Sequence, residues 1–192
     1  AQGESTKVIA ELEQHDPYLQ LYTSGTTGNP KGVVLSHSNL LAEQRISEAN
    51  MADRSSPGSV SILCAPLFHI AGAASMVLNV IAGVHSVLHS TFDPQKIVND
   101  IEEYPDIKIF MVPAMIMAVL QIPDIEKRDF SKLNMIAYGA APITETLLKR
   151  AIEVFQCKFI QNYGMTETTG TVVSLLHVDH QKALQGKPEI LR

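Results

Sequence analysis

Apolar positions along this chain follow two patterns, and segments with one pattern alternate with segments with the other. Short apolar runs, typical of buried strands, alternate with longer segments in which apolar residues recur every three or four positions, as on one face of a helix. In chain order we predict strand 60–64, helix 70–82, strand 84–88, helix 94–104, strand 107–112, helix 113–120, strand 134–138, helix 142–155 and strand 157–161. Strands that alternate with helices predict an α/β fold with a largely parallel sheet flanked by helices.

The most apolar region, 60–84, is the place where a membrane span has to be considered. Pro66, His69, Gly72 and Asn79 interrupt it, whereas a spanning helix needs about 20 mostly apolar residues. We therefore interpret the region as a buried strand followed by a buried helix.

Composition and charge narrow the class of protein. Of the 192 residues, 45% are hydrophobic and 18% are charged, which is enough apolar surface for a substantial core and excludes a disordered chain. The net charge is −5 and the basic residues are scattered, so we expect no nucleic-acid partner. The two cysteines, Cys64 and Cys157, lie in separate apolar runs, which favours reduced thiols in a cytoplasmic protein over a disulfide framework or a zinc site.

Residues 22–32, Tyr-Thr-Ser-Gly-Thr-Thr-Gly-Asn-Pro-Lys-Gly, form a polar loop that precedes the strand-like run 33–35. Glycines let backbone N–H groups approach a ligand, hydroxyls donate further hydrogen bonds, and the lysine adds a positive charge, so the loop suits a polyphosphate. It is not a Walker A loop, because Lys31 follows Pro30 instead of glycine, and it lacks the GxGxxG pattern of a dinucleotide site. From composition alone, a polar turn without a ligand stays an alternative.

Two further segments follow predicted strands and carry candidate chemistry. In 162–168, Tyr163 offers an aromatic face to a purine, Thr166 a donor to a phosphate, and Glu167 an oxygen ligand to Mg²⁺. The small residues of 139–142, Gly-Ala-Ala-Pro, leave room for a ring against the backbone. Each segment, taken alone, also fits an ordinary turn, and the second has a proline suited to the first position of a helix.

These motifs resemble the adenylate-forming superfamily, which includes acyl-CoA synthetases, 4-coumarate-CoA ligases, firefly luciferase and the adenylation domains of peptide synthetases. Residues 22–33 match its phosphate-loop pattern Tyr-Thr-Ser-Gly-Thr-Thr-Gly-x-Pro-Lys-Gly-Val at every specified position. Residues 163–167 resemble its Tyr-Gly-x-Thr-Glu motif, 139–142 its Gly-Ala/Gly-Ala-Pro motif, and 66–69 its Pro-Leu/Met-Phe-His segment.

The resemblance implies a role for each motif residue. The β- and γ-phosphates of ATP would be bound by Thr23, Ser24, Gly25, Thr26, Thr27, Gly28 and Lys31. Adenine would lie against Gly139, Ala140, Ala141, Pro142, Asn162 and Tyr163. Thr166 would hydrogen-bond the α-phosphate, and Glu167 would hold Mg²⁺. The acyl pocket would be formed by His69, Gly72, Met76, Gly164, Met165 and Gly170.

The resemblance also implies an activity, the ATP-dependent activation of a fatty acid as acyl-AMP and its transfer to coenzyme A. The small residues of 71–75 leave volume for a medium or long acyl chain. An aryl- or coumarate-CoA ligase, another adenylating enzyme and a non-catalytic nucleotide-binding module are the alternatives. Residues 1–192 would be the central part of the large N-terminal AMP-binding domain, because the family's Thr-Gly-Asp segment and its late catalytic lysine segment do not occur in them. We therefore expect this chain alone not to complete acyl-CoA synthesis.

The expected partners are ATP, Mg²⁺, coenzyme A and a fatty acid or other carboxylate. We expect a cytoplasmic location, and the alternative is a cytoplasmic protein that also contacts a membrane peripherally. A central piece of a larger domain would leave apolar surface uncovered, which favours homo-oligomers.

Overall fold

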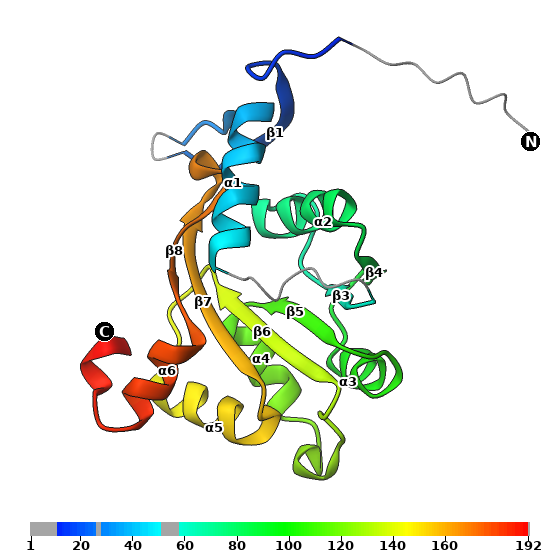
Figure 1. The fold of residues 1–192 in the computed structure, drawn as a ribbon, viewed down its shortest axis with the longest axis vertical. Helices are drawn as coiled ribbons and strands as arrows, with labels where there is room; N and C mark the ends of the chain where they lie inside the picture. The colour runs from blue at the N-terminus through cyan, green and yellow to red at the C-terminus, as the bar shows by residue number, and fades with distance from the viewer. Residues whose placement is uncertain (1–10, 26–27, 51–57, 192) are drawn as a thin grey trace, which may run out of the picture.

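The computed structural model describes residues 11–25, 28–50 and 58–191 and centres on a six-stranded sheet (Figure 1). In spatial order the strands are β4 (His85–Leu88), β3 (Val60–Leu63), β5 (Ile107–Met111), β6 (Leu133–Gly139), β7 (Lys158–Met165) and β8 (Gly170–Leu175). Neighbouring strands are parallel except for β7 and β8, which are antiparallel. The predicted α/β class with a largely parallel sheet is confirmed.

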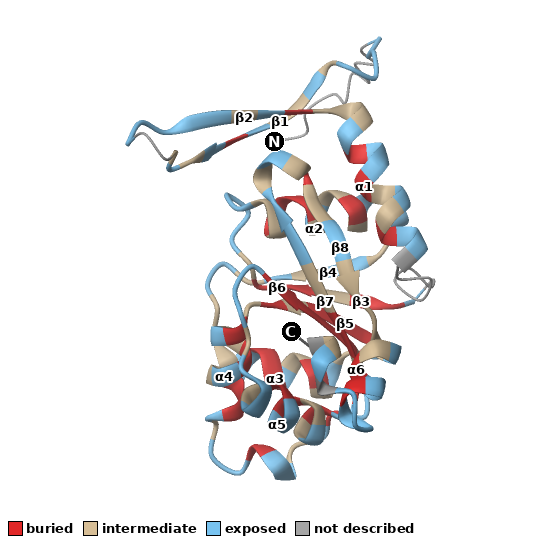
Figure 2. Cartoon of the chain, turned by 90° about the vertical axis from the view of Figure 1, so that its left-hand side faces the viewer, coloured by how far each residue is buried: buried red, intermediate tan, exposed pale blue. Residues whose placement is uncertain are grey.

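Helices cover both faces of the sheet, and the two faces differ in how they are packed (Figure 2). One face carries the main core, under α3 (Pro94–Glu103), α4 (Pro113–Leu120) and α5 (Glu145–Phe155). Ile97, Ile116 and Phe155 on these helices are almost fully buried. The other face is covered by α2 (Ile70–Ala82) and α1 (His37–Asn50), while α6 (His177–Leu184) packs against β7. The face under α3, α4 and α5 therefore holds the main hydrophobic core. The face under α1 and α2 does not, and it is available for a binding site.

The apolar region 60–84 forms β3 and α2, as predicted. Helix α2 spans the predicted range 70–82 and ends at Gly83, which adopts a left-handed conformation with φ +65°. Its N–H bonds to the carbonyls of Asn79 and Val80, the arrangement that commonly terminates a helix at glycine. Within the described ranges, no helix has the length and apolar character needed to cross a membrane.

Strands β1 (Pro17–Thr23) and β2 (Lys31–Ser36) form a separate antiparallel ribbon that leads into α1 (Figure 2). The junction is fixed by a reciprocal pair of hydrogen bonds at the start of the helix. The amide of Ser36 donates to Oδ1 of Asn39 over 2.9 Å, and the amide of Asn39 donates to Oγ of Ser36 over 3.4 Å. Such side-chain acceptors satisfy the free N–H groups of a first helical turn, so the Ser-x-x-Asn sequence directs the chain from ribbon to helix.

Two predicted boundaries differ from the structure by more than one residue. The helix predicted for 142–155 begins at Glu145, because Thr144 caps it, with Oγ1 accepting from the amide of Leu147 at 3.3 Å. The strand predicted to end at 161 continues to Met165, because β8 runs antiparallel to it and pairs with its second half. Beyond residue 161 that strand leaves the core, so its apolar pattern stops before the strand does.

Candidate functional site

The polar loop between β1 and β2 closes a hairpin whose strand ends are fixed by register. Thr23 pairs with Lys31 across the ribbon, which places both at the base of the loop. Gly25 has φ +62°, and a Cβ on it would lie 2.5 Å from the carbonyl oxygen of Asn29. Only glycine fits that position. Lys31 is exposed, so its ammonium is available to an anion outside the hairpin.

The other predicted phosphate-binding residues are distributed along the same loop. Ser24 and Gly28 are exposed within it, and Gly28 has φ +85°. Two of the predicted residues, Thr26 and Thr27, lie outside the described residues. The described part of the loop presents a lysine and hydroxyls without an acidic side chain, which is the composition of an anion site.

The turn Thr166–Thr168 follows β7 directly and contacts β2, so the predicted α-phosphate and metal residues lie in a turn packed against the strand that leaves the loop. Thr168 fixes the turn: its hydroxyl accepts from the amide of Met165 at 3.1 Å and donates to the carbonyl of Gly170 at 2.9 Å. Thr169, which closes the turn, is buried with φ +66°, a conformation that costs free energy in a non-glycine residue. Glu167 itself is exposed.

The Gly-Ala-Ala-Pro segment leaves β6 at the point where β6 and β7 pair through Gly139 and Asn162. A Cβ on Gly139 would lie 2.1 Å from the carbonyl oxygen of Asn162, so glycine is required for this pairing. Ala140 has φ +64°, a second strained residue. Ser174 donates from Oγ to Oδ1 of Asn162 over 2.9 Å, which fixes the amide of a predicted adenine-binding residue.

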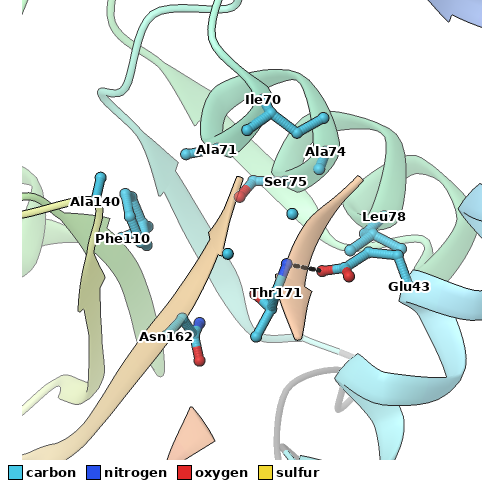
Figure 3. A pocket seen from close by; sticks show the side chains of 12 residues that line it. Glu43, Ile70, Ala71, Ala74, Ser75, Leu78, Phe110, Ala140, Asn162 and Thr171 are labelled. Carbon is cyan, nitrogen blue, oxygen red and sulfur yellow. Dashed lines mark hydrogen bonds between the residues drawn. The ribbon is translucent and has the colours of Figure 1, made fainter. Parts of the chain in front are cut away.

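A cavity of about 80 Å³ lies beside this segment, under α2 and α1 (Figure 3). Helix α2 lines it with Ile70, Ala71, Ala74, Ser75 and Leu78. The strands of the sheet line it with Phe110, Asn162, Gly164, Gly170 and Thr171. Ala140 and Glu43 complete the wall. The cavity therefore lies between a predicted adenine-binding segment and the apolar face of α2.

The structure brings some of the predicted pocket residues to this cavity and places others elsewhere. Gly164 and Gly170 line it. Gly72 does not: it is buried on another side of α2, where a Cβ would lie 2.3 Å from the carbonyl oxygen of Pro66. His69 precedes α2, with its exposed ring 4.7 Å from that of Phe68.

Three further predicted residues have exposed side chains outside the cavity wall: Met76, Met165 and Tyr163. Tyr163 is 61% exposed, and its neighbours 162 and 164 are the ones that reach the cavity. Ala141 and Pro142 are exposed too. Met76 was predicted to line the pocket together with its neighbours, although the spacing of residues 70, 74 and 78 is that of one helix face and excludes 76.

Glu43 and Phe110 are site residues that the sequence did not single out. Glu43 lies on α1 and is 5% exposed. Its Oε1 accepts a hydrogen bond from the amide of Thr171 at 3.4 Å. Burial raises the pKa of the nearby Tyr18 hydroxyl, and the negative charge of Glu43 raises it further.

Thiol and multi-ligand metal chemistry are not supported by the described residues. Burial raises the pKa of Cys64 and of Cys157 to about 12, so both thiols stay neutral and poorly nucleophilic near pH 7. No group of three or more His, Cys, Asp or Glu side chains in the described ranges could hold a metal ion. A metal at Glu167 would therefore share one carboxylate with substrate oxygens and water, which is the way Mg²⁺ is commonly bound beside phosphates.

The chain matches a protein-family model and is similar to several curated proteins. The model of the AMP-binding enzyme family matches residues 1–190. Among curated relatives, a fatty acid–[acyl-carrier-protein] ligase from Streptomyces coeruleorubidus is 37% identical over 85% of this chain and 32% of its own length. A medium/long-chain-fatty-acid–CoA ligase from Mycobacterium tuberculosis is 35% identical over 91% of the chain and 30% of its own length. A feruloyl-CoA synthase from an Amycolatopsis species is 33% identical over 90% of the chain and 35% of its own length.

Solved structures show the same fold. The inhibitor-bound N-terminal domain of FACL13 from Mycobacterium tuberculosis has a TM-score of 0.83 at 27% identity, over 96% of this chain and 45% of its own. The o-succinylbenzoate CoA synthetase of Bacillus subtilis, in complex with ATP and a magnesium ion, has a TM-score of 0.79 at 26% identity, over 94% of this chain and 37% of its own. The chain spans about a third of the length of the curated relatives described.

Proposed function

Because the chain belongs to the AMP-binding enzyme family, we propose that the full-length protein activates a fatty acid as an acyl adenylate and transfers the acyl group to coenzyme A. The observation that carries the proposal is the grouping of three segments far apart in sequence. Strand β2, which begins at Lys31, contacts the turn Thr166–Thr168, and the strand before that turn pairs with Gly139 through Asn162. Residues that bind the phosphates, the metal ion and the adenine of one nucleotide would have to be grouped in this way.

The proposed reaction proceeds in two displacements at one site. The substrate carboxylate, already ionised at neutral pH, attacks the α-phosphorus of ATP, the bond to the bridging oxygen breaks, and pyrophosphate leaves. The thiolate of coenzyme A then attacks the acyl carbonyl, and AMP leaves. No proton has to be removed from the acid, so the task of the site residues is to align the reactants and stabilise charge.

Each motif would contribute a different part of that task. Lys31, with the hydroxyls of Thr23 and Ser24, would bind the leaving pyrophosphate. Thr166 would donate a hydrogen bond to the α-phosphate. Glu167, exposed at the side of the turn that faces solvent, fits a single-carboxylate Mg²⁺ site. When bound, Mg²⁺ supplies positive charge that offsets the charge developing on the phosphates.

An aryl acid is the second candidate substrate class. Two observations favour it: the ring of Phe110 in the cavity wall, and the 33% identity to a feruloyl-CoA synthase. The apolar face of α2 and the identities to two fatty acid ligases favour the fatty acid.

The test is an assay of the full-length protein with Mg-ATP and, in parallel, oleate, 4-coumarate and a set of amino acids. We expect acid-dependent pyrophosphate release, with acyl-AMP detected by mass spectrometry before coenzyme A is added and acyl-CoA afterwards. Turnover of 4-coumarate alone would show that the substrate is an aryl acid and not a fatty acid. ATP binding without pyrophosphate release for any acid would instead indicate a non-catalytic nucleotide-binding module.

A further inference from the structure

Two buried polar side chains lie behind the strands that carry the predicted adenine-binding residues. Tyr138 on β6 and His180 on α6 are 0% and 1% exposed. The hydroxyl of Tyr138 donates a hydrogen bond to Nε2 of His180 over 2.9 Å, and Nδ1 of His180 donates to the carbonyl oxygen of Leu176 over 2.8 Å. Because apolar side chains could fill the same volume without removing polar atoms from water, packing alone does not explain the pair.

The two hydrogen bonds of His180 span three neighbouring strands at one level of the sheet. Tyr138 on β6 pairs with Gln161 on β7, and Gln161 pairs with Leu175 on β8. Leu176, which accepts the hydrogen bond from Nδ1, directly follows Leu175 at the end of β8. His180 therefore connects β6 to the end of β8 across β7.

The next level of the sheet carries the predicted adenine-binding residues. Gly139 on β6 pairs with Asn162 on β7, and Asn162 pairs with Ser174 on β8. The hydroxyl of Ser174 also donates to Oδ1 of Asn162 over 2.9 Å. Each of these three residues is the direct chain neighbour of a residue in the level that His180 spans. A shift of that level would therefore move Gly139 and Asn162 with it.

The backbone next to Tyr138 tolerates little movement. A Cβ on Gly139 would lie 2.1 Å from the carbonyl oxygen of Asn162, and Ala140 has φ +64°. A strained conformation of this kind persists only where the surrounding structure determines it, and a buried polar network whose members are paired makes its surroundings rigid. The Tyr138–His180 pair supplies such a network directly beside the strained residues.

The pair acts from the face of the sheet that lies opposite the cavity. Tyr138 belongs to the main core under α3, α4 and α5, whereas Ala140 and Asn162 line the cavity under α1 and α2 (Figure 3). A nucleotide at the cavity side would therefore not contact Tyr138 or His180, and any effect of the pair on binding would be transmitted by the backbone.

We infer that Tyr138 and His180 are positioning residues for adenine, which hold the backbone at Gly139 and Asn162 in place from behind the sheet. This inference rests on the proposed function. The pair would act on the adenine end of the nucleotide and not on the phosphate loop that precedes Lys31. Its loss should therefore weaken the binding of AMP and leave the binding of pyrophosphate unchanged. A pair that only stabilised the fold would change neither affinity as long as the protein stays folded.

The test is a calorimetric titration of the full-length protein with AMP and, separately, with magnesium pyrophosphate, the two parts into which the proposed reaction divides ATP. Each variant would be titrated well below its unfolding temperature. Tyr138→Phe removes the hydroxyl and keeps the ring in the core. We expect it to raise the dissociation constant for AMP by about threefold or more, the effect of one lost hydrogen bond between neutral groups, without changing that for pyrophosphate.

His180→Gln changes both hydrogen bonds of the pair and should weaken AMP binding at least as much as Tyr138→Phe. His89→Gln is the matched control. His89 also has a nearly buried ring, with 9% of its side chain exposed, and its Nε2 pairs with Asp100. It follows β4, however, at the edge of the sheet opposite to β8. His89→Gln should therefore lower the unfolding temperature without changing the dissociation constant for AMP.

Weaker AMP binding in Tyr138→Phe and His180→Gln, with pyrophosphate binding unchanged, would support the inference. An unchanged dissociation constant for AMP in either folded variant would overturn it, and so would an equal loss of affinity for AMP and pyrophosphate. If the unmodified protein bound AMP but released no pyrophosphate from ATP with any acid, the proposed function would be wrong and the positioning role would stand. If the unmodified protein bound no AMP, both would be wrong.

Discussion

The hydroxyl of Tyr138 donates a hydrogen bond to Nε2 of His180 over 2.9 Å and thereby links β6 to α6. The direction follows from the other ring nitrogen: Nδ1 of His180 lies 2.8 Å from the carbonyl oxygen of Leu176, which can only accept. Nδ1 therefore carries a proton, and burial, which lowers the pKa of His180, favours the neutral ring whose Nε2 accepts from Tyr138. Tyr138 is the last buried residue of β6 before Gly139, so this link holds the strand that leads into the Gly-Ala-Ala-Pro segment.

The free energy of unfolding should fall when the pH is lowered through the range in which histidines titrate. Burial lowers the pKa of His180 in the folded protein, so below the ordinary histidine value of about 6.5 the unfolded chain binds the proton more readily. The contribution of His180 is present above that value and is lost as the pH falls toward the folded pKa. Denaturant unfolding of the full-length protein at several pH values between about 5 and 8 would measure the slope.

The variant His180→Gln should flatten this slope, whereas His85→Gln, which changes an exposed histidine, should not. Some slope should remain, because burial lowers the pKa of His177 as well. A slope that is identical in His180→Gln and the unmodified protein would remove His180 from this role.

Substitution of Gly139 should disturb both the sheet and the candidate nucleotide site. A Cβ in Gly139→Ala would meet the carbonyl oxygen of Asn162 at 2.1 Å, and backbone atoms cannot move aside as a flexible side chain would. We expect a loss of roughly 1–3 kcal/mol in the free energy of unfolding, typical of an overpacked position, together with weaker ATP binding. Ala140→Gly is the matched control, because it relieves the φ of +64° at the next residue.

Calorimetric ATP titration and thermal unfolding of the two variants would distinguish them. Ala140→Gly should keep or raise the unfolding temperature. If Gly139→Ala unfolded and bound ATP like the unmodified protein, the close approach at Asn162 would have no energetic role.

The sequence was informative wherever local signals and burial agreed. Helix 70–82 was predicted to the residue, because its apolar run begins after Pro-Leu-Phe-His and stops at Gly83. Strand β8 was missed, since its exposed residues Val172 and Val173 break the alternation expected of a half-buried strand. Glu43 could not be predicted as a site residue, because it is brought to the cavity wall by tertiary packing, next to Thr171, 128 positions away in the sequence.

Lys31→Ala should weaken ATP binding to the full-length protein without affecting the fold. Lys31 is exposed beside Thr23 at the base of the loop, so it contributes little to stability. Loss of one charge-assisted contact to a phosphate should raise the dissociation constant for ATP by about tenfold or more. Lys149→Ala removes an exposed lysine that pairs with Glu145 on α5 and serves as the control.

Hydrogen exchange across residues 23–32 offers an independent measurement. ATP would give the N–H groups of the loop new acceptors, so their exchange should slow when Mg-ATP is bound. Equal exchange in the two states, with ATP shown to be bound, would contradict the role of this loop as the phosphate clamp.

Glu167→Gln should lower the rate of adenylation more than it lowers the affinity for ATP. The turn that carries Glu167 is held by backbone and Thr168 contacts, and the Glu167 side chain is exposed, so the fold should not change. A carboxylate that helps to hold Mg²⁺ acts mainly on charge that develops as the bond to pyrophosphate breaks. We therefore expect kcat to fall by about tenfold or more, KM for ATP to change far less, and the dependence on Mg²⁺ concentration to become weaker. Glu153→Gln, an exposed carboxylate on α5, should change none of these quantities. If kcat at saturating Mg²⁺ were the same in Glu167→Gln as in the unmodified protein, Glu167 would not be the metal ligand.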